Sequence, residues 1–142
     1  MTLVREIMTT EVACVLDTAP SSAAAIMMRD LNVGALPVIT EDRTLIGIVT
    51  DRDIVCNGVA RELPTSTPVG ELGTLAVYSV RADDPVTAAT DAMREFQVRR
   101  LPVLEDDKLV GIVAQADIAR HLPAQQTADM VEQVSAEEGN IR

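Results

Sequence analysis

The second half of the chain repeats the first half, and this repeat constrains the fold more than any other feature. Leu36-Pro37-Val38 returns as Leu101-Pro102-Val103, and Gly47-Ile48-Val49 returns as Gly111-Ile112-Val113, with a single residue dropped in the intervening loop. A unit of about 60 residues buries too little surface to be well packed alone. We therefore expect two copies of one unit that pack together with pseudo-twofold symmetry, in a chain that forms a homodimer.

Both repeats are predicted to contain the same β-α-β-β-α order of elements, which belongs to the α/β (α+β) fold class. Each copy opens with a short amphipathic segment and a strand-like alternation, followed by a helix, a hairpin of two strands and a second helix. In the first copy these are 4–8, 12–15, a helix with the apolar face Ala24, Met27, Met28 and Leu31, strands 35–39 and 45–49, and a helix from residue 53 to 58 and beyond. In the second copy they are 69–72, 77–80, a helix with the apolar face Ala89, Ala92, Met93 and Phe96, strands 101–104 and 109–113, and a helix over 117–122.

Proline residues mark boundaries in these elements. Asp84-Pro85 predicts the start of the long helix in the second copy, because Asp caps a helix and Pro suits its first turn. Pro37 and Pro102 lack the N–H group that a strand donates, so we expect their strands near a sheet edge or with an irregular start.

The repeat also predicts where the domains begin and end. The first copy spans residues 1–62, the second spans 69–123, and 63–68, with Pro64 and Pro68, form the linker. Beyond the repeat, residues 124–142 are expected to form a short helix and a polar C-terminal tail.

Composition argues against several classes of function. A net charge of −10 and only two aromatic rings, Tyr78 and Phe96, argue against binding to nucleic acid. No apolar run is long enough to span a bilayer, and the N-terminus lacks the apolar core of a signal peptide. We therefore expect a cytoplasmic protein with no membrane partner.

The reactive side chains are too few and too scattered for catalysis. Cys14 and Cys56 do not make a disulfide framework, and we interpret them as small buried hydrophobic residues. Together with His121 they lack the close paired spacings of a structural zinc site, so no metal is predicted. One histidine and two isolated cysteines give no acid–base or nucleophilic set, and we do not expect an enzyme.

The polar corner after each Gly-Ile-Val strand is the predicted functional site. In the first copy this corner runs from Thr50 to Asp53, where backbone N–H groups and the positive end of a helix dipole can hold a phosphate or a ribose. Thr50 and Asp53 also match a capping box, so a purely structural role stays open. In the second copy Ala114 replaces the threonine, and pure capping would leave Asp117 only a dipole contribution of about 0.3–1 kcal/mol.

The repeated plan, with Leu-Pro-Val before one strand and Gly-Ile-Val-x-x-x-Asp at the corner, resembles the CBS domain. Two such domains in tandem resemble a Bateman module, and the resemblance covers residues 3–122. The stretches 50–55, 97–103 and 116–123 are similar to those of stand-alone bacterial CBS-pair proteins, such as the hypoxia- and dormancy-response proteins of actinobacteria.

This resemblance implies a cleft between the repeats that binds AMP, ADP, ATP or S-adenosylmethionine as a regulatory ligand, with no required cofactor. By family position Asp53 would hold the ribose diol, Thr50 would lie near the ribose and phosphate, and Arg100 of the other repeat would reach the phosphate. Asp117 would serve a second site, where Ala35 stands in place of the matching arginine. We therefore rank the Thr50/Asp53 site above the Ala114/Asp117 site.

Two parts of this site keep alternatives open. Arg99 and Arg100 could form surface ion pairs with nearby acids, and because neighbours on a strand face opposite sides, at most one should face the cleft. Family position selects Arg100. Aliphatic residues are left to hold the adenine, although core packing is the main alternative for each of the candidates, which are Val12, Ala13, Ile54, Val77 and Ile118.

The favoured hypothesis is a regulatory module that binds an adenosyl ligand and transmits the signal to an effector protein on another chain. The alternative is a ligand-free CBS-pair dimer that acts as an interaction or stress-response adaptor. The altered second corner, the absence of an arginine at position 35 and the net negative charge favour this alternative.

Overall fold

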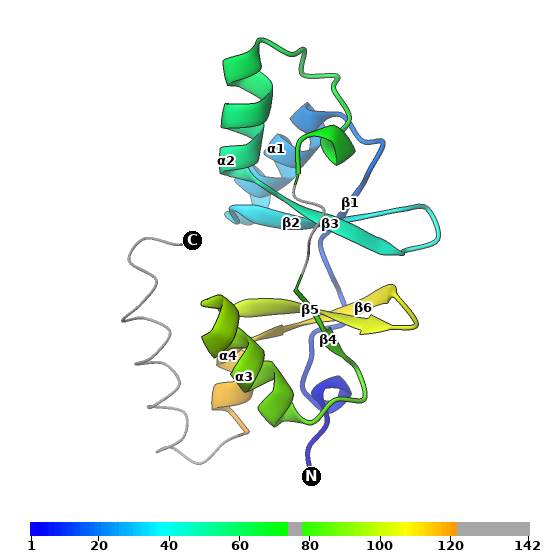
Figure 1. Ribbon diagram of the computed structural model, residues 1–142, viewed down its shortest axis with the longest axis vertical. Coiled ribbons are helices and arrows are strands. Elements are labelled where there is room, and N and C mark those ends of the chain that lie inside the picture. Colours follow the sequence, from blue (N-terminus) through cyan, green and yellow to red (C-terminus); the bar gives the residue numbers. More distant parts are fainter. Residues whose placement is uncertain (74–77, 122–142) are drawn as a thin grey trace. The chain divides into compact units, whose positions relative to one another are not determined.

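The computed structural model describes residues 1–73 and 78–121 of the chain (Figure 1). These residues divide into two compact units. Among the described residues, the first-repeat unit is 13–73, and the second-repeat unit joins 1–12 to 78–121. Each unit has a hydrophobic core of its own.

The first-repeat unit is a three-stranded sheet with its helices on one face (Figure 1). The strand order is β1-β2-β3; β1 runs parallel to β2, and β2 and β3 form an antiparallel hairpin. Its elements are β1 (Val15–Leu16), α1 (Ser21–Leu31), β2 (Ala35–Ile39), β3 (Leu45–Thr50), α2 (Asp51–Asp53), the π-helical turn η2 (Ile54–Gly58) and the 3-10 turns η3 (Val59–Arg61) and η4 (Val69–Glu71).

The second-repeat unit has the same architecture, with strand order β4-β5-β6. Its elements are the 3-10 turn η1 (Val4–Glu6), β4 (Val80–Arg81), α3 (Val86–Phe96), β5 (Arg100–Glu105), β6 (Lys108–Ala114) and α4 (Gln115–Ala119). The predicted α+β class, the order of elements and the two hairpins are therefore confirmed. The second helix of each unit starts two residues earlier than predicted, directly at the end of its hairpin.

The long helices bury the predicted faces except at their last residue. The predicted face positions Ala24 and Met28 of α1 and Ala89 and Met93 of α3 are buried, and Met27 and Ala92 are partly buried against the same cores. Leu31 and Phe96 are instead about half exposed, at 50% and 45%. Each is the final residue of its helix, and the next residue turns into the left-handed region, at Asn32 and Gln97.

Two predictions about proline are corrected. Pro85 itself is the N-cap of α3, while Asp84 Oδ2 accepts a hydrogen bond from Arg81 N–H at 2.8 Å and therefore closes the preceding turn. Pro37 in β2 and Pro102 in β5 both lie in the central strand of their sheet, not at an edge. This is tolerated because the short strands β1 and β4 pair only with the two residues that follow each proline, so each proline precedes the part of its strand that has neighbours on both sides.

The opening segment of the chain packs in the second-repeat unit. Val4 N–H donates to Asp84 O at 2.8 Å, and the Val4 side chain is fully buried in that core. The Arg5 guanidinium binds Asp83 and Glu105, and the hydrogen bond and charge of Arg5 hold the pKa of the Asp83 carboxyl below its usual value. The compact units thus differ from the repeats of the sequence, whose boundaries at 1–62 and 69–123 stay a prediction.

The opening of the second repeat lies in the first-repeat unit in the same way. Val69 is fully buried in that core, and its N–H donates to Ala19 O at 2.8 Å. The predicted linker, 63–68, is fastened to the start of α1, because Ser21 N–H donates to Thr67 O at 2.8 Å and Ser21 Oγ donates to Thr65 O at 3.1 Å. The tail predicted at 124–142 lies outside the described residues.

Two remaining predictions concern cysteine and the membrane. Cys14 is half-buried, but Cys56 is exposed, so the expectation of burial is wrong for Cys56, which lies in η2 next to the exposed Val55. Within residues 1–73 and 78–121, no helix combines the length and the apolar character that crossing a bilayer requires.

Candidate functional site

The corner between β3 and α2 contains the predicted capping box. Thr50 has an extended backbone, and its Oγ1 accepts a hydrogen bond from Asp53 N–H at 3.0 Å. In return Asp53 Oδ2 accepts from Thr50 N–H at 2.9 Å. These two bonds fix the rotamers of both side chains, which are partly buried.

The capping box occupies only one of the two carboxylate oxygens of Asp53. Within the described part of the chain, no donor contacts Asp53 Oδ1. Thr50 Oγ1 uses a lone pair in the box, so its own hydrogen remains available to donate. The corner can therefore cap its helix and also bind one hydroxyl donor and one anionic acceptor.

The corner between β6 and α4 has the same backbone but different bonds. Ala114 N–H donates to Asp117 Oδ2 at 2.8 Å, so Asp117 still makes the capping-box bond from its side chain to the backbone of the N-cap residue. The expectation that pure capping would leave Asp117 only a dipole contribution is thus wrong. Asp117 is buried, with 7% of its surface exposed, and its Oδ1 accepts from Arg120 Nη2 at 2.6 Å.

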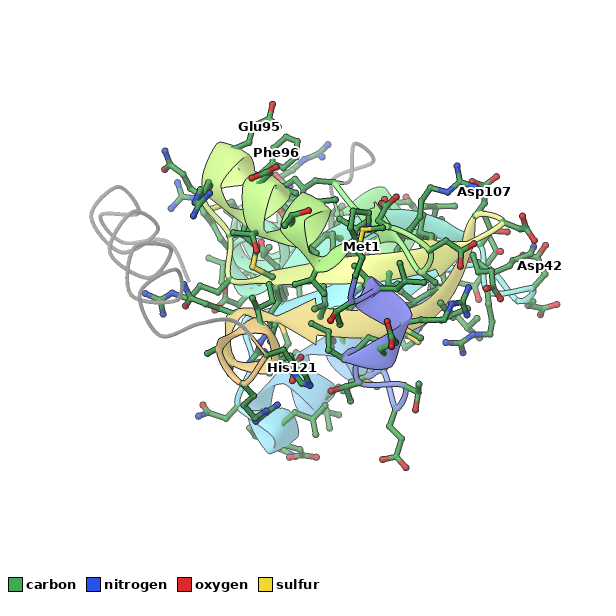
Figure 2. The ribbon with its side chains drawn as sticks, turned by 90° about the horizontal axis from the view of Figure 1, so that it is seen from below. Met1, Asp42, Glu95, Phe96, Asp107 and His121 are labelled. Atoms are coloured by element: carbon green, nitrogen blue, oxygen red, sulfur yellow. The ribbon has the colours of Figure 1, made fainter. Side chains whose placement is uncertain are left out.

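Arg120 was not indicated by the repeat, because the same register aligns it with Cys56. The available signal was local: Arg120 follows Asp117 by one helical turn, a spacing at which opposite charges meet. His121, labelled in Figure 2, follows α4 by two residues; its Nδ1 donates to the Asp117 carbonyl oxygen at 2.9 Å and fixes the same turn.

Arg100 begins β5, is exposed, and has Ala114 as its cross-strand partner. Ala35 occupies the equivalent place opposite Thr50 in the first-repeat unit. Arg100 therefore flanks the Ala114 corner of its own unit. The predicted pairing of Arg100 with Thr50 and Asp53 involves residues of both units and stays a prediction.

The five candidates for holding an adenine differ in burial. Ile118 is fully buried in the second-repeat core, and Ile54 packs against the first-repeat core, so core packing accounts for both. Val12 is partly buried and Ala13 is exposed, while Val77 lies outside the described residues. A ligand-binding role for these residues stays a prediction.

The two aromatic rings of the chain stack on each other. Tyr78 and Phe96 have ring centroids 5.0 Å apart and planes inclined by 18°, and both are exposed. Figure 2 shows Phe96 next to Glu95 at the outer end of α3. The sequence had indicated Phe96 as a core residue, because helical periodicity alone does not reveal that the helix ends there.

Among the residues that the structure describes, no group of three or more His, Cys, Asp and Glu side chains could hold a metal ion. One buried side-chain donor near the second corner also has no partner there: Gln115 Nε2, which follows Ala114 in α4.

Comparison with known proteins links this geometry to a family. A family model described as the CBS domain matches residues 4–57 and 61–124. The chain is 43% identical to hypoxic response protein 1 of Mycobacterium tuberculosis over 135 residues, which cover 94% of each chain. A crystal structure of Hypoxic Response Protein I with two coordinated zinc ions matches at 46% identity with a TM-score of 0.75, over 86% of this chain and 100% of that chain.

Two other solved structures that resemble this chain contain adenosyl ligands. CBSX2 in complex with AMP matches with a TM-score of 0.73 at 28% identity, over 90% of this chain and 99% of that one. The CBS domain pair of protein MJ0100, in complex with 5′-methylthioadenosine and S-adenosyl-L-methionine, matches with a TM-score of 0.67 at 28% identity, over 84% and 94% of the two chains.

Proposed function

Because the chain belongs to the CBS-domain family, we propose that it is a regulatory module that binds an adenosine-containing ligand at the Thr50–Asp53 corner. One observation carries this proposal: the capping box fixes Asp53 through Oδ2 and leaves Oδ1 without a donor in the described residues. A carboxylate held in this way can accept a charge-assisted hydrogen bond from a ribose hydroxyl without reorganising.

The other parts of the proposed site rest on the hydroxyl group of Thr50 and, for Arg100, on its position in the family motif. The hydroxyl hydrogen of Thr50 can donate to a phosphate oxygen, and Arg100 is the proposed cation for that phosphate. The ligand class is supported by the CBS-domain structures that contain AMP and S-adenosyl-L-methionine. We further propose that the chain works as a cytoplasmic homodimer and transmits ligand binding to an effector protein on another chain.

Zinc has no assigned role in this proposal. The related Hypoxic Response Protein I was solved with two coordinated zinc ions. In this chain the residues that the structure describes offer no group of three or more potential metal ligands.

A second candidate function is favoured by the other corner. Both oxygens of Asp117 accept hydrogen bonds from within the chain, which is what a corner with a purely structural role would show. If Asp53 also served only its helix, the protein would be a ligand-free CBS pair that acts as an interaction or stress-response adaptor.

Isothermal titration calorimetry against AMP, ADP, ATP and S-adenosylmethionine separates the two candidates. We expect saturable binding that Asp53→Ala weakens by roughly tenfold or more, the loss of at least one charge-assisted hydrogen bond. Asp117→Ala should have a smaller effect. Asp30→Ala is the matched control, because it removes an exposed carboxylate of α1 in the same unit. The absence of saturable heat at millimolar ligand would leave the adaptor function.

A further inference from the structure

The two corners differ most at the residue that follows each motif aspartate by three positions. In the second-repeat unit this residue is Arg120, and in the first-repeat unit it is Cys56. Arg120 Nη2 lies 2.6 Å from Asp117 Oδ1, the oxygen whose counterpart in Asp53 has no donor in the described residues. The aspartates therefore share a capping bond and differ in their second oxygen.

From this difference we infer that Arg120 is an internal competitor that keeps the Ala114–Asp117 corner from binding a nucleoside. The inference rests on the proposed function, because it concerns the same ligand chemistry at the second corner. A ribose hydroxyl would need Asp117 Oδ1 as its acceptor, and the guanidinium already donates to that oxygen with the advantage of opposite charge.

The burial of Asp117 supports a competition between Arg120 and a ribose hydroxyl for its carboxylate. Asp117 is the one ionisable residue among the buried side chains of the described residues, and its side chain is 10% exposed, whereas that of Arg120 is 67% exposed. A nearly buried carboxylate that loses its cation would gain strongly from a new donor. Because Asp117 is nearly buried, this is not an ordinary exposed ion pair, and a ribose hydroxyl that displaced Arg120 would have to offset the cost of separating the two charges.

The local backbone keeps Arg120 beside its partner. α4 ends at Ala119, Arg120 is its C-cap, and His121 Nδ1 donates to the carbonyl oxygen of Asp117. In the first-repeat unit the helical backbone instead continues through η2, with the exposed, uncharged Cys56 at the matching position.

A polar group next to Ala114 also lacks a partner among the described residues. Gln115 Nε2 is buried and has no acceptor in the described part of the chain. Most buried donors in folded proteins have a partner, so this amide at the start of α4 is an exception.

The test is calorimetry with adenosine, which has the ribose but no phosphate, so that changes in net charge matter little. Wild-type protein should bind about one adenosine per chain, and Asp53→Ala should remove most of that binding. In the Asp53→Ala background, Arg120→Ala should restore binding to roughly tenfold tighter than Asp53→Ala alone, the gain of one charge-assisted hydrogen bond. Adding Asp117→Ala should abolish the restored binding.

Two controls isolate the role of Arg120. Arg29→Ala removes another exposed, ion-paired arginine and should restore nothing in the Asp53→Ala background. Arg120→Lys keeps a cation within reach of Asp117, so adenosine binding in the Asp53→Ala background should stay weak. Circular dichroism of each variant checks that it is folded.

The outcomes separate this inference from the proposed function. If the wild type binds adenosine through Asp53 but Arg120→Ala adds nothing, the competitor role is overturned while the proposed function stands. If Arg120→Ala weakens AMP and leaves adenosine unchanged, the arginine holds phosphate, which also overturns the inference. If neither the wild type nor any variant binds, both are overturned.

Discussion

Asp53 and Asp117 show that a capping role and a ligand role need not exclude each other. The sequence posed them as alternatives because a capping box and a ribose site require the same residues at the same spacing. A carboxylate has two oxygens, and at Asp53 the helix uses one of them. What the sequence could not reveal was the state of the second oxygen, which depends on whether a cation such as Arg120 lies one turn further along.

Thr50→Ala should destabilise the protein by about 1 kcal/mol, because it removes the acceptor for Asp53 N–H. The matched change, Ala114→Thr, should stabilise it by up to about 1 kcal/mol, because Ala114 has the same extended backbone and its capping-box bond to the Asp117 side chain is already formed. Urea unfolding without ligand measures both. Equal stability of Thr50→Ala and the wild type would show that the box contributes little to folding.

At the scale of elements, periodic patterns predicted most of what is observed. The hairpins and long helices follow from alternation and helical spacing, which are local properties of the sequence. The predictions that were wrong concern positions at which tertiary contacts, and not local pattern, determine the structure. Pro37 can lie in a central strand because β1 is short and does not pair with it. Phe96 is exposed because α3 ends there, and its ring stacks on Tyr78.

The outer edge of β6 is covered by the opening segment of the chain. Thr9 N–H donates to Ile112 O at 2.8 Å, and Ile112 N–H donates to Thr9 O at 2.9 Å. A Cβ atom at Gly111 would lie 2.5 Å from Met8 Sδ and 3.0 Å from Thr9 O. The motif glycine is therefore required for this close approach, in addition to any role near the ligand.

Gly111→Ala should accordingly destabilise the protein by about 1–3 kcal/mol, the usual range for overpacking. The opening segment has to move, because one of the close atoms is the backbone oxygen of Thr9. Gly34→Ala is the control, since its nearest atom is the flexible side-chain oxygen Asp51 Oδ2 at 3.3 Å. Urea midpoints of the two variants measure the difference, and a larger loss for Gly34→Ala would contradict this account.

At the scale of the whole molecule, the repeat of the sequence and the units of packing do not coincide. Each opening segment is encoded with one repeat but completes the core of the unit built mainly from the other. The repeat predicted two units because identical patterns imply identical folds. It could not assign the opening segments, because Val4 and Val69 are apolar residues in similar patterns that would fit either core.

Because each opening segment completes the core of the other repeat's unit, a core mutation in that segment should loosen that unit and not its own repeat. Val4→Ala removes a fully buried side chain and should cost about 2 kcal/mol, with faster amide hydrogen exchange in β4, β5 and β6. Val69→Ala is the matched variant, also fully buried, and should loosen β1, β2 and β3 instead. Hydrogen-exchange mass spectrometry resolves the two sheets by peptide. If Val4→Ala loosened mainly the first-repeat unit, stability would follow the sequence repeats and not the packing units seen here.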